Sequence, residues 1–209
     1  MVHKILFRVL GFFLIFNWLV LLIYNIFWGY WGYMLWLSNI VLLITGISLI
    51  FENTNWLSVS FVSIFFMHAL WIFDFFTNLF MGSSFLGFTE YLASISFLDV
   101  LLTSHHFYLL PIIIYSLYIK KKFNENAWLL SSALFLFLLL ASFLLTGPLY
   151  NVNCSHDTCG VLEYDYFYFN YFLEMGYVYY FLAVTISMTL FNFLVVNKVF
   201  HYLFKKFLV

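Results

Sequence analysis

Six long apolar segments constrain the fold of this chain more than any other feature. They are residues 5–28, 33–51, 56–80, 98–119, 128–145 and 171–196. A bilayer core needs about 20 mainly apolar residues for each helical crossing. The segments are therefore predicted to be transmembrane helices. Because a chain of 209 residues leaves no room for a separate soluble domain, we expect one all-α integral membrane bundle of six transmembrane helices.

The composition excludes the ordinary soluble classes. Hydrophobic residues make up 66% of the chain and charged residues 8%, and the mean hydropathy is +1.02. These values lie far outside the range of a globular domain in water. The unbroken apolar runs also differ from the alternating strands of a membrane barrel. The expected partner is a lipid bilayer, and no nucleic acid is expected.

The basic residues fix the predicted topology. They form three clusters: Lys4 with Arg8; Lys120, Lys121 and Lys122; and Lys198, Lys205 and Lys206. Six crossings place all three clusters on one side of the membrane. Since Lys and Arg accumulate on the cytoplasmic side, both termini are predicted to be cytoplasmic.

Several polar side chains interrupt the apolar segments at similar predicted depths. They are Ser38, Asn39, His68, Asp74, His105 and His106. At 1.5 Å per residue they lie roughly 8–18 Å below the outer boundary. Ionisable groups in hydrocarbon are costly and mark a functional site by default. We therefore expect Asp74 and at least one of His105 and His106 to line one outward-facing cavity, with Ser38 or Asn39 on its wall.

Local spacing adds detail to this polar layer. Asp74 and Asn78 are four residues apart, so they share a helix face. His106 shares a face with Asp99, seven residues before it. Pro111 cannot donate a backbone hydrogen bond, and we expect it to kink the fourth span.

Residues 149–170 form the longest predicted outer loop and contain both cysteines. In an oxidising compartment, Cys154 and Cys159 are expected to form a small disulfide loop. The alternative is that both cysteines bind zinc or copper together with His156.

The sequence resembles two families of six-span membrane proteins. One is a bacterial family without an established activity, matched by Trp71-x2-Asp74-Phe, Gly87-x-Thr89-x-Tyr91, Ser104-His105-His106 with Pro111, and Asn151-Val-Asn153. This resemblance implies a bacterial inner (plasma) membrane location. A more distant likeness is to the androgen-induced/FAR-17a group of intramembrane acyl-ester hydrolases, which use a nucleophile in an early span and a histidine before a proline. Ser38 and His105 or His106 are similar in placement, although that group uses Thr or Cys as the nucleophile.

Three functions remain open from the sequence. The first is an intramembrane acyl-ester hydrolase or acyltransferase that acts on a lipid or acyl substrate. Its nucleophile would be Ser38, and its base would be a histidine of the fourth span. Asp74 or Asp99 would orient that histidine, and Asn39 would donate a hydrogen bond to the oxyanion. A haem- or metal-binding protein would use His68 with His105 or His106. A non-catalytic subunit or small transporter would instead have a partner in a membrane complex.

Overall fold

The computed structural model describes residues 2–93, 96–146, 152–155 and 177–207. Over these ranges the regular structure is entirely helical and contains no strand. Five helical stretches are long and apolar enough to cross a membrane: Val2–Phe27, Thr54–Met81, Phe97–Lys120, Ala127–Leu145 and Tyr179–Lys206. The all-α class predicted from the sequence is therefore confirmed, and the five long apolar helices support the predicted membrane character.

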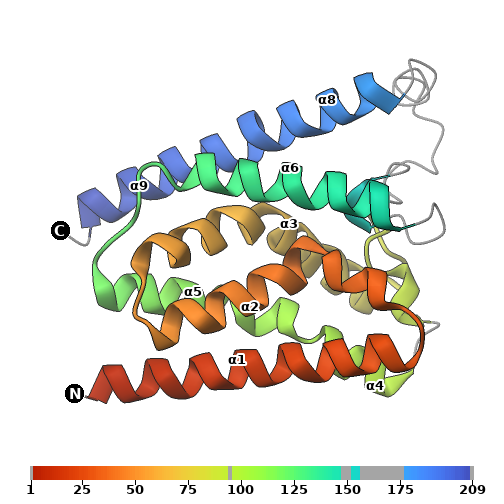
Figure 1. Ribbon diagram of the computed structural model, residues 1–209, viewed down its shortest axis with the longest axis horizontal. Helices are drawn as coiled ribbons and strands as arrows, with labels where there is room; N and C mark the ends of the chain where they lie inside the picture. The colour runs from red at the N-terminus through yellow and green to blue at the C-terminus, as the bar shows by residue number, and fades with distance from the viewer. Residues whose placement is uncertain (1, 94–95, 147–151, 156–176, 208–209) are drawn as a thin grey trace.

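The elements follow one another in a simple order (Figure 1). They are α1 (Val2–Phe27), η1 (Trp31–Leu35), α2 (Leu37–Ile50), α3 (Thr54–Met81), η2 (Glu90–Ala93), α4 (Phe97–Thr103), α5 (His105–Lys120), α6 (Ala127–Leu145), η3 (Val152–Cys154), α8 (Tyr177–Ser187), the π-helical η4 (Met188–Leu194) and α9 (Val195–Phe207). Cys159 and His156 lie outside the described ranges, so the disulfide between Cys154 and Cys159 and the alternative metal site stay predictions.

The second apolar segment forms a helix shorter than expected. Its helix, α2, has 14 residues and begins at Leu37, four residues after the predicted start. The delay has a local cause, because residues 31–35 form a separate 3-10 turn, η1. Asn39 stabilises this turn by donating from Nδ2 to the Tyr33 carbonyl at 2.8 Å. Asn153 accepts from the Leu37 backbone N–H at 2.9 Å and thereby caps α2. A helix of this length spans about 21 Å, so a sixth crossing remains an expectation.

The fourth segment is interrupted at Ser104. Helix α4 ends at Thr103 and α5 begins at His105, while Pro111 lies inside α5. The kink expected at Pro111 stays a prediction, and the break between the helices, which was not predicted, lies seven residues earlier. It places two histidines at the first positions of a new helix.

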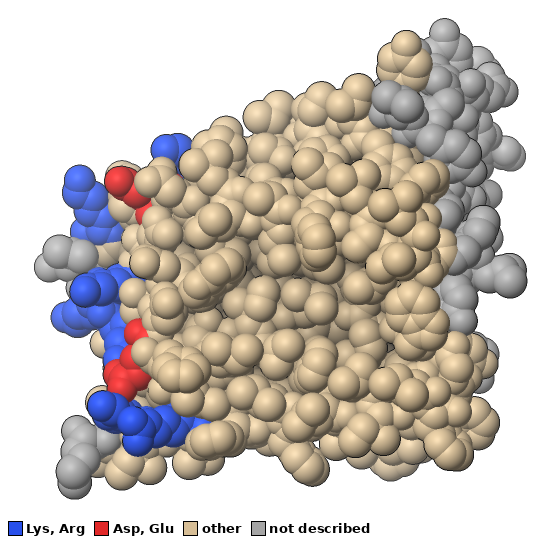
Figure 2. All heavy atoms as spheres, in the orientation of Figure 1, with Lys and Arg blue, Asp and Glu red and all other residues tan. Residues whose placement is uncertain are grey.

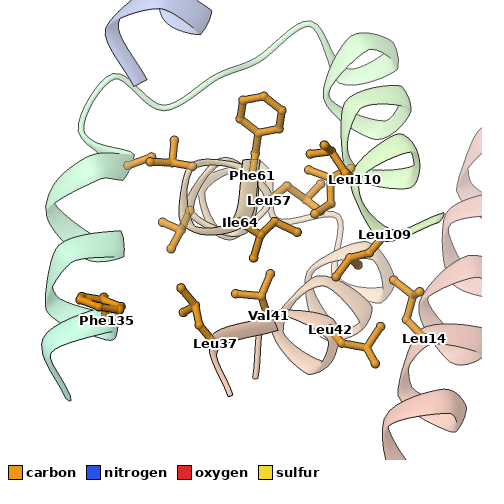
Figure 3. Close-up of a cluster of buried hydrophobic side chains, with 14 of the residues drawn as sticks. Leu14, Leu37, Val41, Leu42, Leu57, Phe61, Ile64, Leu109, Leu110 and Phe135 are labelled. Atoms are coloured by element: carbon orange, nitrogen blue, oxygen red, sulfur yellow. The ribbon is translucent and has the colours of Figure 1, made fainter. Parts of the chain in front are cut away.

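Helix α3 lies at the centre of the bundle. Of its apolar span 56% is buried, against 28% or less for each of the other four long stretches. Helices α2, α5 and α6 pack against it, and Val41, Leu109 and Phe135 from these helices belong to the same buried cluster (Figure 3). Helices α1 and α2 pack backbone to backbone, since a Cβ on Gly11 would lie 2.7 Å from the Gly46 carbonyl oxygen.

The last helical stretch extends beyond its predicted end at Val196. It continues as α9 to Phe207. The lysines that end the apolar run lie on an amphipathic helix whose aromatic residues still pack inward. The Phe200 ring lies 4.5 Å from Phe61 and 4.6 Å from Phe65, and the Phe204 ring lies 5.2 Å from Phe123. The lysines that begin at Lys198 mark the end of the predicted membrane segment, but the helix itself continues past them to Phe207.

Both chain ends lie at the same end of the bundle (Figure 1). The Lys and Arg side chains visible in Figure 2 gather there too. Glu52, between α2 and α3, accepts a hydrogen bond from Lys120 of α5 and lies 3.7 Å from Lys4 of α1. We refer to this region as the basic end.

Candidate functional site

Three histidines from two helices meet in the interior of the bundle. His68 lies on α3, and His105 and His106 open α5. The ring centroids of His68 and His106 are 4.7 Å apart, those of His105 and His106 are 4.3 Å apart, and those of His68 and His105 are 6.4 Å apart. The Trp71 ring stacks on His106 at 4.6 Å. We call His68, His105 and His106 the three-histidine centre.

The centre lies near the middle of the apolar thickness. His68 is fourteen residues after the start of α3 at Thr54 and thirteen before its end at Met81, about 20 Å of helix from either end. His68 and His105 are each only 2% exposed. This position agrees with the sequence, which places His68 at the deep end of the predicted layer, roughly 18 Å below the outer boundary. The depth of the histidines makes uncompensated polarity more costly there.

The break before α5 fixes the tautomers of His105 and His106. Nδ1 of His105 lies 3.1 Å from the carbonyl oxygen of Leu102, and Nδ1 of His106 lies 2.8 Å from that of Thr103. A carbonyl oxygen only accepts hydrogen bonds, so each Nδ1 carries the proton. In a neutral imidazole the other nitrogen then holds a lone pair. Both histidines thus have Nε2 available as an acceptor or a ligand.

Several nitrogens of the centre have no hydrogen-bond partner in the part of the chain that the structure describes. They are Nδ1 and Nε2 of His68 and Nε2 of His105, all buried. Leaving a buried polar group unpaired costs about 1–3 kcal/mol. Native proteins satisfy most such groups. Ten other buried side-chain atoms in the described ranges also lack a partner, so the centre is distinguished by having three such nitrogens on two neighbouring rings.

Asp74 has a different role from the one expected. It is fully buried, and its carboxylate accepts four hydrogen bonds from the chain that follows α3. The donors are Ser84 Oγ at 2.5 Å, the Leu86 backbone N–H at 2.6 Å, the Thr89 backbone N–H at 2.9 Å and Thr89 Oγ1 at 3.0 Å. Asn78 shares the face, as predicted, and donates to the Thr89 carbonyl at 3.2 Å. Asp74 therefore anchors residues 84–89 over the end of α3, and none of these bonds involves a histidine.

The other predicted site residues also have separate places. Asn39 is occupied in the η1–α2 turn described above. Ser38 is half-buried at the start of α2, and no hydrogen bond within the described ranges joins it to a histidine. Asp99 caps α4 through Ser96 and accepts from the Tyr24 hydroxyl of α1 at 2.6 Å. The structure therefore brings together the three histidines but does not join them to a serine or a carboxylate.

Residues outside the predicted site set complete these arrangements, and three of them, Trp71, Thr89 and Asn153, belong to the motifs quoted for the first resemblance. Trp71 forms one wall of the three-histidine centre, and Ser84 and Thr89 hold Asp74. Asn153 joins η1 and α6 by donating to the Leu35 carbonyl at 2.8 Å and to Ser142 Oγ at 3.0 Å. The signal for the Asp74 anchor was the run of small and hydroxyl residues between Gly82 and Thr89, which is typical of a loop that binds a carboxylate through backbone and hydroxyl donors.

The distances between the histidine rings help to distinguish the two expected ligands, a haem and a single metal ion. A haem held by His68 and His105 would place its macrocycle between their rings, but His106 lies within 4.7 Å of both. One metal ion is compatible with the spacing, because imidazoles bound tetrahedrally at metal–nitrogen distances of ~2 Å have ring centres about 5 Å apart. Across the described ranges, no group of three or more His, Cys, Asp or Glu residues is arranged so that it could hold a metal ion. A metal site at the centre therefore requires an arrangement of the rings that differs from the one in the structure.

No protein-family model, no curated protein and no solved structure matches the chain. The resemblance to six-span families thus remains a prediction, and the function must be inferred from the geometry of the three-histidine centre.

Proposed function

We propose that the chain is an integral membrane protein whose three-histidine centre binds one transition-metal ion within the bilayer. The observation that carries the proposal is the set of buried ring nitrogens of His68 and His105 that lack any hydrogen-bond partner in the described part of the chain. Imidazole is the usual nitrogen ligand for zinc, copper, nickel and iron. An ion would bind one ring nitrogen of His68 together with Nε2 of His105, and so would pair two of the three nitrogens.

The orientation of His105 and His106 supports this function. Metal-binding histidines commonly donate their second ring N–H to a backbone carbonyl or a carboxylate, which fixes the tautomer and raises ligand basicity. His105 and His106 both have this arrangement, through Leu102 and Thr103. Trp71 limits ring rotation of His106 by stacking on it. Two of the three ligands are thus oriented before an ion binds.

The charge of the surroundings favours a monovalent ion. The carboxylates nearest in sequence, Asp74 and Asp99, are both engaged by loop or capping donors. Three neutral imidazoles leave the charge of the ion uncompensated, and the cost of transferring an ion from water rises with the square of its charge, roughly fourfold from one to two. We infer that Cu⁺ binds more tightly than Zn²⁺ or Ni²⁺.

The test is a metal titration of the full chain purified in mild detergent. Wild type should bind about one Cu⁺ per chain in competition with a chromogenic chelator, and Zn²⁺ and Ni²⁺ should bind more weakly. The double variant His68→Gln/His106→Gln should lose about a hundredfold in affinity or more. His3→Gln is the matched control, since His3 is exposed at the start of α1, and it should bind as wild type. Equal binding by both variants would overturn the proposal.

We further propose six crossings with both termini cytoplasmic, in a bacterial inner membrane. The common position of the chain ends and of the basic clusters supports an even number of crossings, and the positive charge supports the orientation. In a background with Cys154 and Cys159 replaced by serine, Ser83→Cys and Asn126→Cys should react with an impermeant thiol reagent from opposite sides. Labelling from the same side would contradict this topology.

The acyl-ester hydrolase hypothesis lacks a comparable observation. Its nucleophile, Ser38, would need a base within hydrogen-bond reach and a group that orients this base. The described hydrogen bonds provide orienting carbonyls for the histidines but no contact with Ser38. A lipid substrate is therefore not part of the function proposed here.

A further inference from the structure

A pocket of about 310 Å³ opens at the basic end of the bundle. Three separate parts of the chain form its walls: the start of α3, the turn between α5 and α6, and α9. Its polar lining includes Thr54, Asn55, Lys121, Lys122, His201 and Lys205. Phe123 and Phe204, which stack on each other at 5.2 Å, also line it. The packing of α9 on α3 thus brings together cations that lie more than 80 positions apart in the sequence.

The lysines of this pocket differ from their neighbours in having no carboxylate partner. Lys120 and Lys4 both pair with Glu52 outside the pocket. Lys121, Lys122 and Lys205 make no ion pair within the described ranges. The carboxylate of Glu125 reaches the lining, since its Oε2 lies 3.8 Å from Nε2 of His201. The pocket is therefore lined by three ammonium groups that have no ion pair in the described ranges.

The backbone holds one of these lysines in an uncommon conformation. Lys121 ends α5 in the left-handed region with φ of 49°, where glycine is the usual residue. Such strain persists only when the surroundings maintain it, and it concentrates at binding sites. The left-handed residue reverses the chain direction directly after α5, and it places Lys121 and Lys122 on the pocket wall instead of in a continued helix.

We propose that this pocket binds a phosphate group. Lysine ammonium groups are strong phosphate ligands, and the Thr54 hydroxyl and the Asn55 amide can add neutral hydrogen bonds. The pocket lies where the apolar helices end, at the depth of lipid headgroups, and basic pockets at this depth bind anionic headgroups. The same chemistry fits free inorganic phosphate. This site is at the opposite end of α3 from the Asp74 anchor and does not depend on metal binding.

The experiment measures binding to the full chain in mild detergent, with three probes. They are soluble short-chain phosphatidylglycerol, short-chain phosphatidylcholine as the zwitterionic control, and inorganic phosphate. Phosphatidylglycerol should bind at least tenfold more tightly than phosphatidylcholine, and its affinity should fall as salt is raised. Binding of phosphatidylglycerol without binding of inorganic phosphate identifies a lipid headgroup as the ligand. Equal affinity for both, or binding of inorganic phosphate alone, identifies free phosphate.

Two triple variants of equal charge separate a pocket from general attraction to the basic end. Lys121→Gln/Lys122→Gln/Lys205→Gln should weaken binding at least tenfold. Arg8→Gln/Lys198→Gln/Lys206→Gln removes the same charge from residues that do not line the pocket, and it should change affinity less than twofold. The proposal is overturned if neither anionic probe binds, if phosphatidylcholine binds as well as phosphatidylglycerol, or if both triple variants lose the same affinity.

Discussion

Asp74 and the three-histidine centre are both buried polar groups in an apolar bundle, yet their surroundings are opposite. The Asp74 carboxylate accepts four hydrogen bonds, all from residues 84–89. Within the described ranges, neither ring nitrogen of His68 has a partner, and His105 Nε2 also lacks one. The loop after α3 supplies hydrogen-bond donors to both carboxylate oxygens of Asp74, whereas three ring nitrogens of the histidines remain without a partner in the described part of the chain.

This difference separates structural from functional polarity inside a membrane protein. A charge in hydrocarbon must be paired or hydrated wherever it lies. When the chain supplies every donor, as for Asp74, the group stabilises the fold and has no capacity left for a ligand. When buried nitrogens have no hydrogen-bond partner, as in the three-histidine centre, the fold is less stable than it would be with those nitrogens paired. A ligand that binds them raises the free energy of unfolding. The two sites should therefore respond in opposite directions to replacement by leucine.

The largest effect is expected for Asp74→Leu. The leucine leaves the backbone N–H groups of Leu86 and Thr89 without their acceptor, which should lower the free energy of unfolding by about 3 kcal/mol, since each unpaired buried donor costs ~1–3 kcal/mol. Thermal unfolding in detergent measures the loss, and hydrogen exchange should speed up at both amides. Asp74→Asn is the matched control, since it keeps an acceptor and should lose only about 1 kcal/mol. Loss of Cu⁺ binding in Asp74→Asn would show that Asp74 belongs to the metal site, and it would contradict the purely structural role given to Asp74 above.

The next effect has the opposite sign. His68→Leu removes two unpaired buried nitrogens at similar volume, so the metal-free protein should gain about 1 kcal/mol in the free energy of unfolding. The same variant should lose the additional stability that Cu⁺ gives to wild type. Thermal unfolding with and without Cu⁺ measures both quantities. His3→Leu, at an exposed position, should leave both unchanged. A destabilised His68→Leu protein would show that the imidazole nitrogens have partners in the bundle.

Much of the fold could be predicted because apolar runs with charged borders have few alternatives. The predicted segments 56–80 and 128–145 agree with α3 and α6 within two residues at each end. The errors arose where a local interaction competed with hydropathy. Asn39 and η1 delay the start of α2, an unpredicted break at Ser104 divides the fourth segment, and aromatic packing extends α9 beyond its first lysine.

The candidate site could be predicted only in part, because depth along a helix does not determine which face a side chain occupies. The histidines of adjacent segments do meet. The proposed link from Asp74 to a histidine does not form in the described hydrogen bonds, because Ser84 and Thr89 reach the carboxylate after the chain turns at Gly82, which has φ of 73°. Nothing in helical periodicity reports a contact made by a loop that folds back on its own helix.

A smaller effect is expected where a paired group is only partly buried, as at Glu52. The hydrogen bond from Lys120 and the charge of Lys4 lower the pKa of Glu52 below its ordinary value. A lowered pKa in the folded state contributes stability at neutral pH, and that contribution is lost as the pH falls below the ordinary value of 4.5. Glu52→Gln should therefore lower the melting temperature by ~1–2 °C at pH 7 and by less at pH 4, because exposed ion pairs contribute little. If Glu52→Gln lowered the melting temperature as much as Asp74→Leu does, the number of hydrogen-bond and ion-pair partners would matter more for stability than the burial of the group.

The smallest effect is expected at Ser38, which is polar but neither fully buried nor joined to a histidine. A half-buried hydroxyl can bond to water or to its own backbone, so its removal leaves no uncompensated donor. Ser38→Ala should change the melting temperature by less than ~1 °C and Cu⁺ affinity by less than about twofold. A fluorophosphonate probe, which labels activated serines, should leave Ser38 of the wild type unmodified. If the wild type were labelled and the labelling disappeared in both Ser38→Ala and His106→Gln, the histidines would activate this serine. The three-histidine centre would then supply the general base of an acyl-ester hydrolase.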